Sequence, residues 1–424
     1  MAKSAVAAAV EPVEQGDAEE FRRRITFIAI GMMVVVLAYP DSGIGKIPLR
    51  FLLKDQLHLE PHMLAYFFTI VNLPSWCKIL IGIVSDTFPL FGTRRRNYVL
   101  LASVTGMALW GVMALIPKSF LPLLVVGLAL NAMATVCGTM HGAVVMEEGN
   151  RHGATGRIIS IRSVFSHIAA LIGAPLGGYL AGQALGWTCA AGAMIFLVMV
   201  VTAYSCLHES PTARPKAGVG QATWNQMKML GRSKMLWAAG GLMFLVQVAP
   251  GFSTPLFFYQ TDSLHFSGKF IGILGGVGSG CSIVSGFVYF FLCRRFKLRQ
   301  VITICISLNV AGAAAYLAYH TPVSAFLIDG LYGLAGSLGY LCLFDLTARA
   351  TPKGSEAVGY SVMMVFVNLA MAGSDIIGSN VYELFHKQFA PLVPINAATT
   401  ALVLLAVPFL PAALVNRRDG EKAA

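Results

Sequence analysis

The sequence predicts an all-α membrane protein with twelve transmembrane helices, arranged as two parallel-repeat bundles of six helices each. Of the 424 residues, 56% are hydrophobic and 12% are charged, and the mean hydropathy is +0.69. A soluble domain has roughly a quarter of its residues charged, so this chain must be surrounded largely by lipid. Apolar segments long enough to cross a bilayer, about 20 residues each, occur twelve times. A polar stretch at 208–234 separates the first six from the last six.

The expected helices follow the apolar segments directly. They lie near 25–43, 62–84, 98–117, 120–146, 158–183, 186–207, 235–259, 268–293, 300–319, 322–346, 357–382 and 392–415. The resulting organisation is a disordered cytoplasmic tail at 1–24, a first bundle at 25–207, a cytoplasmic linker at 208–234, a second bundle at 235–415 and a cytoplasmic tail at 416–424.

The basic residues predict the orientation of the chain in the membrane. With the N-terminus inside, 24 of the 31 Lys and Arg residues fall in cytoplasmic segments and 6 in outer ones. Such a bias places both termini in the cytoplasm. The net charge of +11 therefore reflects topology, and we expect no nucleic-acid partner. Residues 1–20 are acidic and lack an apolar core, so we expect them to be neither a signal peptide nor a transit peptide. We expect a multi-pass protein of the bacterial inner (plasma) membrane.

A short pattern occurs in both halves of the sequence. Asp55, Leu57 and His58 precede the second helix, and Asp262, Leu264 and His265 precede the eighth, at a constant offset of 207 residues. A basic turn follows each of the two helices. The matching topological positions indicate an internal repeat of six helices, which is typical of secondary transporters.

A motif between the second and third helices combines an acid, a turn and a basic cluster. Its residues are Gly82, Asp86, Gly92, Arg94, Arg95 and Arg96. One interpretation is that the cations only fix the orientation of the chain in the membrane. The other is a gate, in which Asp86 pairs with the arginines or with a helix N-terminus and so stabilises one conformation.

This loop and its surroundings resemble the folate–biopterin transporter family within the major facilitator superfamily. The resemblance rests on the segments 53–61, 74–78, 85–92 and 94–96, and it extends to 153–157, 354–357 and 368–369. It implies a twelve-helix facilitator fold and transport of folates, pterins or related solutes. One departure concerns the fourth helix, where Gly138 and Gly142 stand in place of the acidic residues of family members. The resemblance therefore supports membership of the family more strongly than it supports the identity of the solute.

Ionisable side chains at membrane depth are costly, so each is a candidate functional residue. Lys78 contacts an anionic solute or is a structural charge; the resemblance, in which lysine occupies this position, favours the first. Asp375 and Asp329 are candidates for proton coupling or are satisfied structural acids. His141 and His167 are proton carriers or ordinary buried histidines. Arg162 is expected to extend to the membrane interface.

Other polar and aromatic residues complete the expected substrate site. Aromatic rings and amides suit a flat heterocycle, although Tyr and Trp are common in membrane proteins in any case. The expected substrate-binding residues are Lys78, Asp41, His141, Gln247, Tyr259 and Asn368, and the expected proton-coupling residues are Asp375, Asp329 and His141.

Glycines at four-residue spacing predict close helix packing. They are Gly173 and Gly177 in the fifth helix and Gly272, Gly276 and Gly280 in the eighth. In the resembled fold these two helices pack against each other between the halves.

The sequence predicts a secondary transporter that works by alternating access on a small anionic or heterocyclic solute, with proton symport as one possibility. It contains no nucleotide-binding loop of the pump type and no HExxH, CxxC or GxSxG element. We therefore expect no enzymatic activity, no cofactor, no metal site and, besides solute and lipid, no partner, with the chain as a monomer. The alternatives are a facilitator-type carrier for an unrelated organic solute, a channel, and a membrane-embedded sensor or enzyme.

Overall fold

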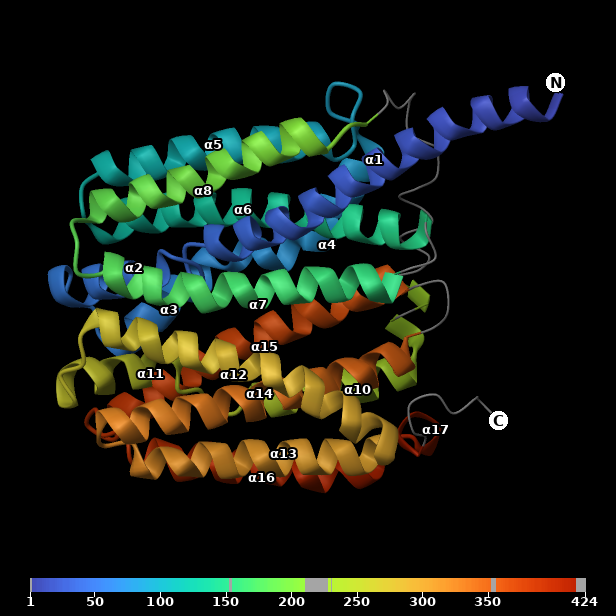
Figure 1. Ribbon diagram of the computed structural model, residues 1–424. Coiled ribbons are helices and arrows are strands. Elements are labelled where there is room, and N and C mark those ends of the chain that lie inside the picture. Colours follow the sequence, from blue (N-terminus) through green and yellow to red (C-terminus); the bar gives the residue numbers. More distant parts are fainter. Residues whose placement is uncertain (1, 152–154, 210–227, 230, 352–355, 417–424) are drawn as a thin grey trace.

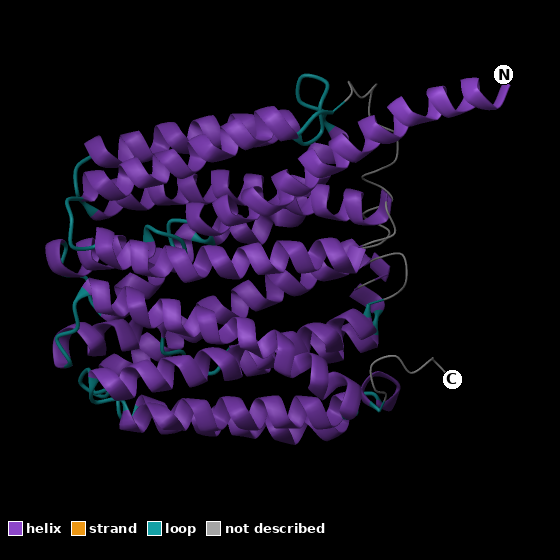
Figure 2. Cartoon of the chain, in the orientation of Figure 1, coloured by secondary structure: helices purple, strands orange, loops and turns teal. Residues whose placement is uncertain are grey.

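The computed structural model describes residues 2–151, 155–209, 228–229, 231–351 and 356–416. Within these ranges the chain forms helices joined by loops (Figure 2), with one isolated β-bridge between Leu90 and Thr93. The long helices run side by side, and α1 begins at the same end of the bundle at which α17 lies (Figure 1). We call this the terminal end, and the opposite one the distal end.

The described helices fall into two groups that lie one above the other in Figure 1. The first group, here the N-half, consists of α1 (Ala2–Ala38), α2 (Lys46–Phe51), α3 (Pro61–Val71), α4 (Lys78–Thr87), α5 (Arg96–Leu115), α6 (Phe120–Arg151), α7 (Thr155–Leu180) and α8 (Leu185–Cys206). The second, the C-half, consists of α10 (Lys234–Gln247), α11 (Ser253–Phe258), α12 (Gly268–Arg295), α13 (Leu298–Ala315), α14 (Pro322–Ala350), α15 (Glu356–Leu384), α16 (Leu392–Leu402) and α17 (Ala412–Val415).

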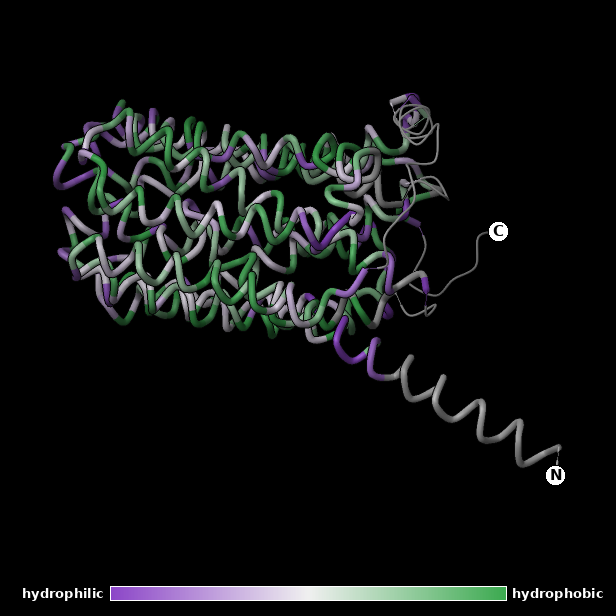
Figure 3. Tube along the Cα trace, turned by 90° about the horizontal axis from the view of Figure 1, so that it is seen from above, coloured by the Kyte–Doolittle hydropathy of each residue, from purple (hydrophilic) through white to green (hydrophobic). Residues whose placement is uncertain are grey.

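Ten helical segments of the described chain are long and apolar enough to cross a membrane. Apolar residues predominate along the bundle between its ends (Figure 3), and large ones such as Phe291 and Trp187 are 70% and 66% exposed. The predicted helices at 25–43 and 235–259 are not among the ten. The first ends at Ala38, just before Pro40, and the second is divided into α10 and α11 by a non-helical segment that contains Pro250.

The N-terminal segment differs from the prediction. Residues 1–24 were expected to be a disordered tail, whereas α1 is helical from Ala2 onward. This segment contains the run Ala7-Ala8-Ala9, and alanine has the highest helix propensity of all residues. Helix formation therefore continues outward from the apolar part of α1.

The predicted helix at 62–84 is interrupted. Helix α3 ends at Val71, a 3₁₀ turn spans Leu73–Cys77, and α4 begins at Lys78. Pro74 lacks a backbone N–H, and its ring clashes with the preceding turn of a continuous α-helix. The chain therefore forms the tighter 3₁₀ turn at this point. The interruption places Lys78 at the first residue of a new helix rather than within a long one.

The segments that carry the sequence pattern have the same local backbone, 207 residues apart. Each contains a π-helical turn, at Leu52–Gln56 and at Tyr259–Ser263. His58 and His265 follow with φ angles of 50° and 54°. The loops are closed by equivalent hydrogen bonds, Leu59 N to Leu53 O at 3.1 Å and Phe266 N to Gln260 O at 2.8 Å.

The two halves meet along α7 and α12, and again where α15 contacts α3. Glycine permits the first contact, because a Cβ atom at Gly178 would lie 2.4 Å from Gly268 O and 2.8 Å from Gly272 Cα. Gly276 and Gly280 of α12 face Pro175 and Leu171 of α7. Gly272, Gly276 and Gly280 therefore lie on the face of α12 that meets α7.

For Gly173 and Gly177 the expected neighbour is wrong. A Cβ atom at Gly173 would lie 2.6 Å from Leu37 Cδ2 of α1, and one at Gly177 would lie 2.9 Å from Ile44 O. Both positions point into the N-half, because the face of α7 that meets α12 carries Leu171, Pro175 and Gly178 instead.

Candidate functional site

Polar contacts join the two halves at the distal end of the bundle. The ring Nδ1 atom of His62 lies 2.7 Å from Glu383 Oε2, and the His62 backbone N–H donates to Glu383 Oε1 at 2.7 Å. Ion pairs also connect Lys54 with Asp262 and Glu60 with Lys387. Each of these contacts has one partner in the N-half and the other in the C-half.

Arg50 makes a further contact between the halves at the distal end. It is buried, with 7% of its surface exposed. Its guanidinium donates to Ser253 O at 3.0 Å and to Ser253 Oγ at 2.9 Å. The rings of Phe68 and Phe257 lie 5.7 and 5.6 Å from its Cζ atom. The N-half helix α2 is thereby attached to the first residue of α11.

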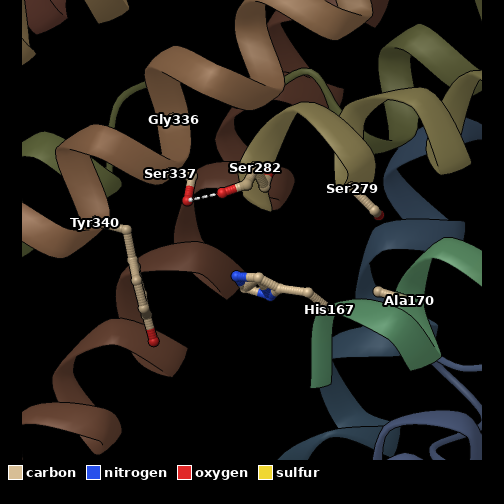
Figure 4. A pocket seen from close by; sticks show the side chains of 7 residues that line it. All are labelled: His167, Ala170, Ser279, Ser282, Gly336, Ser337 and Tyr340. Atoms are coloured by element: carbon tan, nitrogen blue, oxygen red, sulfur yellow. Dashed lines mark hydrogen bonds between the residues drawn. The ribbon is translucent and has the colours of Figure 1, made fainter. Parts of the chain in front are cut away.

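A cavity of about 330 Å³ lies between the halves. It is lined by His167 and Ala170 of α7, Ser279 and Ser282 of α12, and Gly336, Ser337 and Tyr340 of α14 (Figure 4). The His167 ring points into this space from the N-half, opposite the serines and the tyrosine of the C-half. No protein partner in the described chain forms a hydrogen bond with the His167 ring.

The serines of the cavity wall are held by neighbouring helix backbones. Ser282 Oγ donates to Gly278 O at 2.9 Å and to Gly333 O at 3.1 Å, and Ser337 Oγ donates to Ser282 O at 3.4 Å. These bonds join α12 to α14 and fix the hydroxyl oxygens, which retain capacity to accept. The wall therefore offers hydroxyl acceptors and one imidazole to a polar solute.

A charged cluster lies in the N-half. Lys78 Nζ is 5.8 Å from the centroid of the Tyr39 ring, and Asp41 Oδ1 accepts a hydrogen bond from Asn131 Nδ2 at 3.0 Å. Lys78 and Asp41 are close enough to attract each other electrostatically, although they form no ion pair. Asp41 and Lys78 are thus the two predicted substrate residues that the fold brings together.

His141 has the surroundings of a structural residue. It is 1% exposed, its Nε2 atom lies 2.8 Å from Ile28 O, and its ring packs 5.8 Å from that of Phe27. The hydrogen bond joins α6 to α1. The ring does not line the cavity described above, and its predicted roles in substrate binding and proton coupling stay predictions.

The two predicted proton-coupling acids accept hydrogen bonds from neutral groups. Asp329 accepts from the hydroxyls of Tyr316 and Tyr319 at 2.7 and 2.8 Å. Asp375 accepts from the backbone N–H and the hydroxyl of Thr254 at 2.8 and 2.7 Å. Asp375 thereby satisfies a donor in the first turn of α11.

The remaining predicted substrate residues lie apart from one another. The Tyr259 hydroxyl donates to Tyr319 O at 3.1 Å, and its ring stacks on Phe389 at 5.0 Å. Gln247 is the last residue of α10, and Asn368 lies in α15. None of these three lines the cavity between the halves.

The loop motif lies at the terminal end. Arg95 donates to Ser85 Oγ at 2.7 Å and to Glu147 Oε1 at 2.9 Å, which joins the start of α5 to α4 and α6. Gly92 has a φ of 83°, as the turn requires. Gly82 lies in α4, and the Asp86 side chain is outside the described residues, so the proposed pairing of Asp86 with the arginines stays a prediction.

Further ionic contacts surround this loop. The backbone N–H groups of Arg94 and Arg95 donate to Glu209 Oε2 at 2.9 and 3.1 Å, and Arg96 lies over the Tyr204 ring at 5.2 Å. Arg151 donates to Glu20 at 3.0 Å, and this hydrogen bond lowers the pKa of the Glu20 carboxyl below its usual value. These contacts lie within the N-half and at Glu209, which follows α8, so they help to order this end of the N-half.

Sequence reasoning did not single out the cavity serines. Ser279, Ser282 and Ser337 lie in long apolar helices where serine is common, and nothing in their spacing distinguishes them from packing residues. One feature of the sequence could have indicated them. Ser279 and Ser282 lie beside the glycines of α12, a helix that was already expected to lie between the halves.

Known proteins resemble this chain in sequence and in fold. The model of the BT1 family matches residues 41–419. The folate-biopterin transporter of Synechocystis sp. is 26% identical over 391 residues, covering 87% of this chain and 78% of the relative. Folate transporter 1 of Plasmodium falciparum is 22% identical over 380 residues, covering 83% and 72%.

Two solved structures share the fold. The nucleoside transporter NupG superposes with a TM-score of 0.67 at 14% identity, covering 92% of this chain and 98% of that one. A D-xylose-proton symporter superposes with a TM-score of 0.65 at 13% identity, covering 94% and 98%.

Proposed function

This chain belongs to the BT1 family of folate–biopterin transporters, and we propose that it moves a folate-like or pterin-like solute across a membrane by alternating access. As a member of this family it is a transporter and not an enzyme. The observation that carries the proposal is the arrangement of the two halves. Polar contacts close the distal end, whereas the cavity lined by His167, Ser282 and Tyr340 lies between the same two halves.

The proposed topology has twelve spans in two repeats of six. Ten segments meet the requirements for a span, and α1 together with the α10–α11 pair supplies the other two. The equivalent turns at Leu52–Gln56 and Tyr259–Ser263 support the repeat, because unrelated segments rarely share both a π-helical turn and a histidine with positive φ.

We place both termini in the cytoplasm of a bacterial cell, with the protein a monomer in the inner membrane. The excess of Lys and Arg at the terminal end supports this orientation. The closed distal end then faces outward, and the structure represents a conformation closed to the outside. Opening would require Arg50 to release Ser253 and His62 to release Glu383.

The cavity suits a flat, polar heterocycle. A pterin ring presents N–H donors to hydroxyl and imidazole acceptors, and Tyr340 supplies an aromatic face. We also propose coupling to protons at Asp329, because its carboxylate accepts only from tyrosine hydroxyls among the described residues, so that protonation breaks no ion pair.

The test is uptake of radiolabelled folate into proteoliposomes that contain the purified protein. The proposal predicts saturable uptake that unlabelled biopterin inhibits by competition. The variant Ser337→Val, which removes a cavity hydroxyl, should raise the concentration for half-maximal uptake. Leu115→Val, at an exposed position remote from the cavity, serves as its control. Uptake equal to that of empty liposomes would contradict the proposal.

A further inference from the structure

Two buried tyrosines hold the carboxylate of Asp329. Asp329 of α14 accepts from the Tyr316 hydroxyl on Oδ1 at 2.7 Å and from the Tyr319 hydroxyl on Oδ2 at 2.8 Å. Tyr316 begins the 3₁₀ turn Tyr316–Ala318, which follows α13, and Tyr319 comes directly after this turn. The tyrosines are 4% and 0% exposed, and Asp329 forms no ion pair with any described residue. Each carboxylate oxygen therefore accepts one hydroxyl donor from the same short segment.

Tyr319 also connects this segment to the π-helical turn Tyr259–Ser263. Its hydroxyl accepts from Gln260 Nε2 at 2.6 Å, and its carbonyl accepts from the Tyr259 hydroxyl at 3.1 Å. Gln260 is 5% exposed, so water does not replace its partner readily. Because a hydroxyl has a single hydrogen, Tyr319 can accept from Gln260 and remain satisfied only while Asp329 accepts that hydrogen.

The π-helical turn Tyr259–Ser263 is part of the closure at the distal end. Within this turn, Asp262 forms an ion pair with Lys54 of the N-half. Helix α11 runs directly into the turn and contacts α2 of the N-half through the rings of Phe257 and Phe51, whose centroids are 5.1 Å apart. A displacement of the turn therefore alters contacts between the two halves.

Asp329 also adjoins the wall of the cavity between the halves. It lies about one helical turn before Gly333, whose carbonyl accepts from the Ser282 hydroxyl of that wall at 3.1 Å. A Cβ atom at Gly278 of α12 would lie 3.4 Å from the Asp329 carbonyl oxygen, and Gly278 directly precedes Ser279 of the same wall. Along α14, Asp329 thus lies between the distal start of the helix and the residues that line the cavity.

We propose that Tyr316 and Tyr319 couple the protonation state of Asp329 to the opening of the distal end. The inference rests on the proposed proton coupling and adds how it acts. A proton on either carboxylate oxygen deprives one tyrosine hydroxyl of its acceptor. A buried hydroxyl without an acceptor is costly, so protonation destabilises the closed distal end and the ionised carboxylate stabilises it. By linkage, the proton binds when the distal end is open and leaves when it closes.

The experiment measures distances between the halves by pulsed EPR in solute-free protein. Spin labels replace Lys118 and Gln388, which are exposed distal positions on opposite halves. In the wild type, the fraction of long distances should rise at least about threefold between about pH 8 and about pH 5. Asp329→Asn removes the proton site and records the pH dependence of all other groups, which include His62 and Glu383 at the same end.

Tyr319→Phe should reduce the pH dependence to that of Asp329→Asn, because Oδ2 can then take a proton without loss of a hydrogen bond. Tyr332→Phe is the matched control and should keep the wild-type dependence. The Tyr332 ring packs on that of Tyr316 at 5.2 Å, and its hydroxyl forms no hydrogen bond with any described residue.

A second variant keeps the test decisive if Tyr319→Phe does not fold. Gln260→Met leaves both hydrogen bonds to Asp329 in place and removes the one between Gln260 and Tyr319, so its pH dependence should be smaller than that of Tyr332→Phe. Wild-type dependence in Tyr319→Phe or in Gln260→Met would overturn the coupling. Equal dependence in the wild type and Asp329→Asn would do the same.

These distances require no solute, so the coupling and the proposed function can fail separately. If the distances respond to pH as expected and proteoliposomes take up no folate, the coupling stands and the proposed solute is wrong. If folate is taken up and the distances do not respond to pH, transport stands and the tyrosines do not couple it to protons.

Discussion

His62 Nδ1 of α3 lies 2.7 Å from Glu383 Oε2 of α15, and this pair connects the two halves of the chain at the end of the bundle farthest from α17. The side chains are 32% and 25% exposed, so the pair is accessible to water yet shielded from most of it. Together with Arg50 and Ser253 it holds the distal end closed.

Glu383→Gln should favour opening of the distal end. The variant weakens the contacts that the half-buried Glu383 carboxylate makes with the ring and the backbone N–H of His62. A hydrogen bond contributes roughly 0.5–1.5 kcal/mol, and its loss shifts a two-state equilibrium several-fold. Spin labels at Lys118 and Thr321, which are exposed distal positions on opposite halves, would report a larger fraction of long distances by pulsed EPR. Glu19→Gln is the control, since Glu19 pairs with Arg23 within α1. An unchanged distance distribution in Glu383→Gln would mean that this pair does not hold the halves together.

Gly178→Ala should separate α7 from α12. The new methyl group would lie 2.4 Å from Gly268 O and 2.8 Å from Gly272 Cα, and neither backbone atom can rotate away. Overpacking of this kind costs about 1–3 kcal/mol, so thermal unfolding in detergent should occur at a lower temperature. Gly186→Ala should have little effect, because a Cβ atom there meets no atom within 4 Å. Equal melting temperatures for both variants would show that α7 and α12 are not in close contact.

Asp329→Asn should abolish stimulation of uptake by a pH gradient and preserve exchange of solute across the membrane. The amide cannot carry the proton, whereas it can still accept a hydrogen bond from Tyr316 or Tyr319. Uptake into proteoliposomes with and without an imposed gradient separates the two effects. Glu19→Gln, at an exposed position within α1, is the control. Full gradient stimulation in Asp329→Asn would remove this residue from the coupling mechanism.

Much of the fold could be predicted because the bilayer imposes a simple length and composition on each span. The paired turns preceding α3 and α12 were also visible, since Asp55 and His58 have counterparts at Asp262 and His265. The break at Leu73–Cys77 was not predicted, although Pro74 was a local signal for it. Proline occurs inside other helices here without a comparable interruption, as Pro175 does in α7.

The candidate site was less predictable, because it depends on which face each helix presents. Lys78 could be selected from its chemistry alone, since a lysine within an apolar segment is unusual. Ser282 and His167 could not, because their proximity follows from the contact between α7 and α12. Asp375 is the reverse case. Its acid is easily noticed in an apolar segment, but in the structure it accepts hydrogen bonds from Thr254 at the start of α11.

The most direct test of alternating access is counterflow in proteoliposomes. Vesicles loaded with unlabelled folate and diluted into a trace of radiolabelled folate should accumulate label transiently above its external concentration, because a carrier returns with its site occupied. Vesicles without internal folate should show no overshoot. Accumulation that never exceeds equilibrium, at the same rate in loaded and empty vesicles, would contradict a carrier whose halves open to one side at a time.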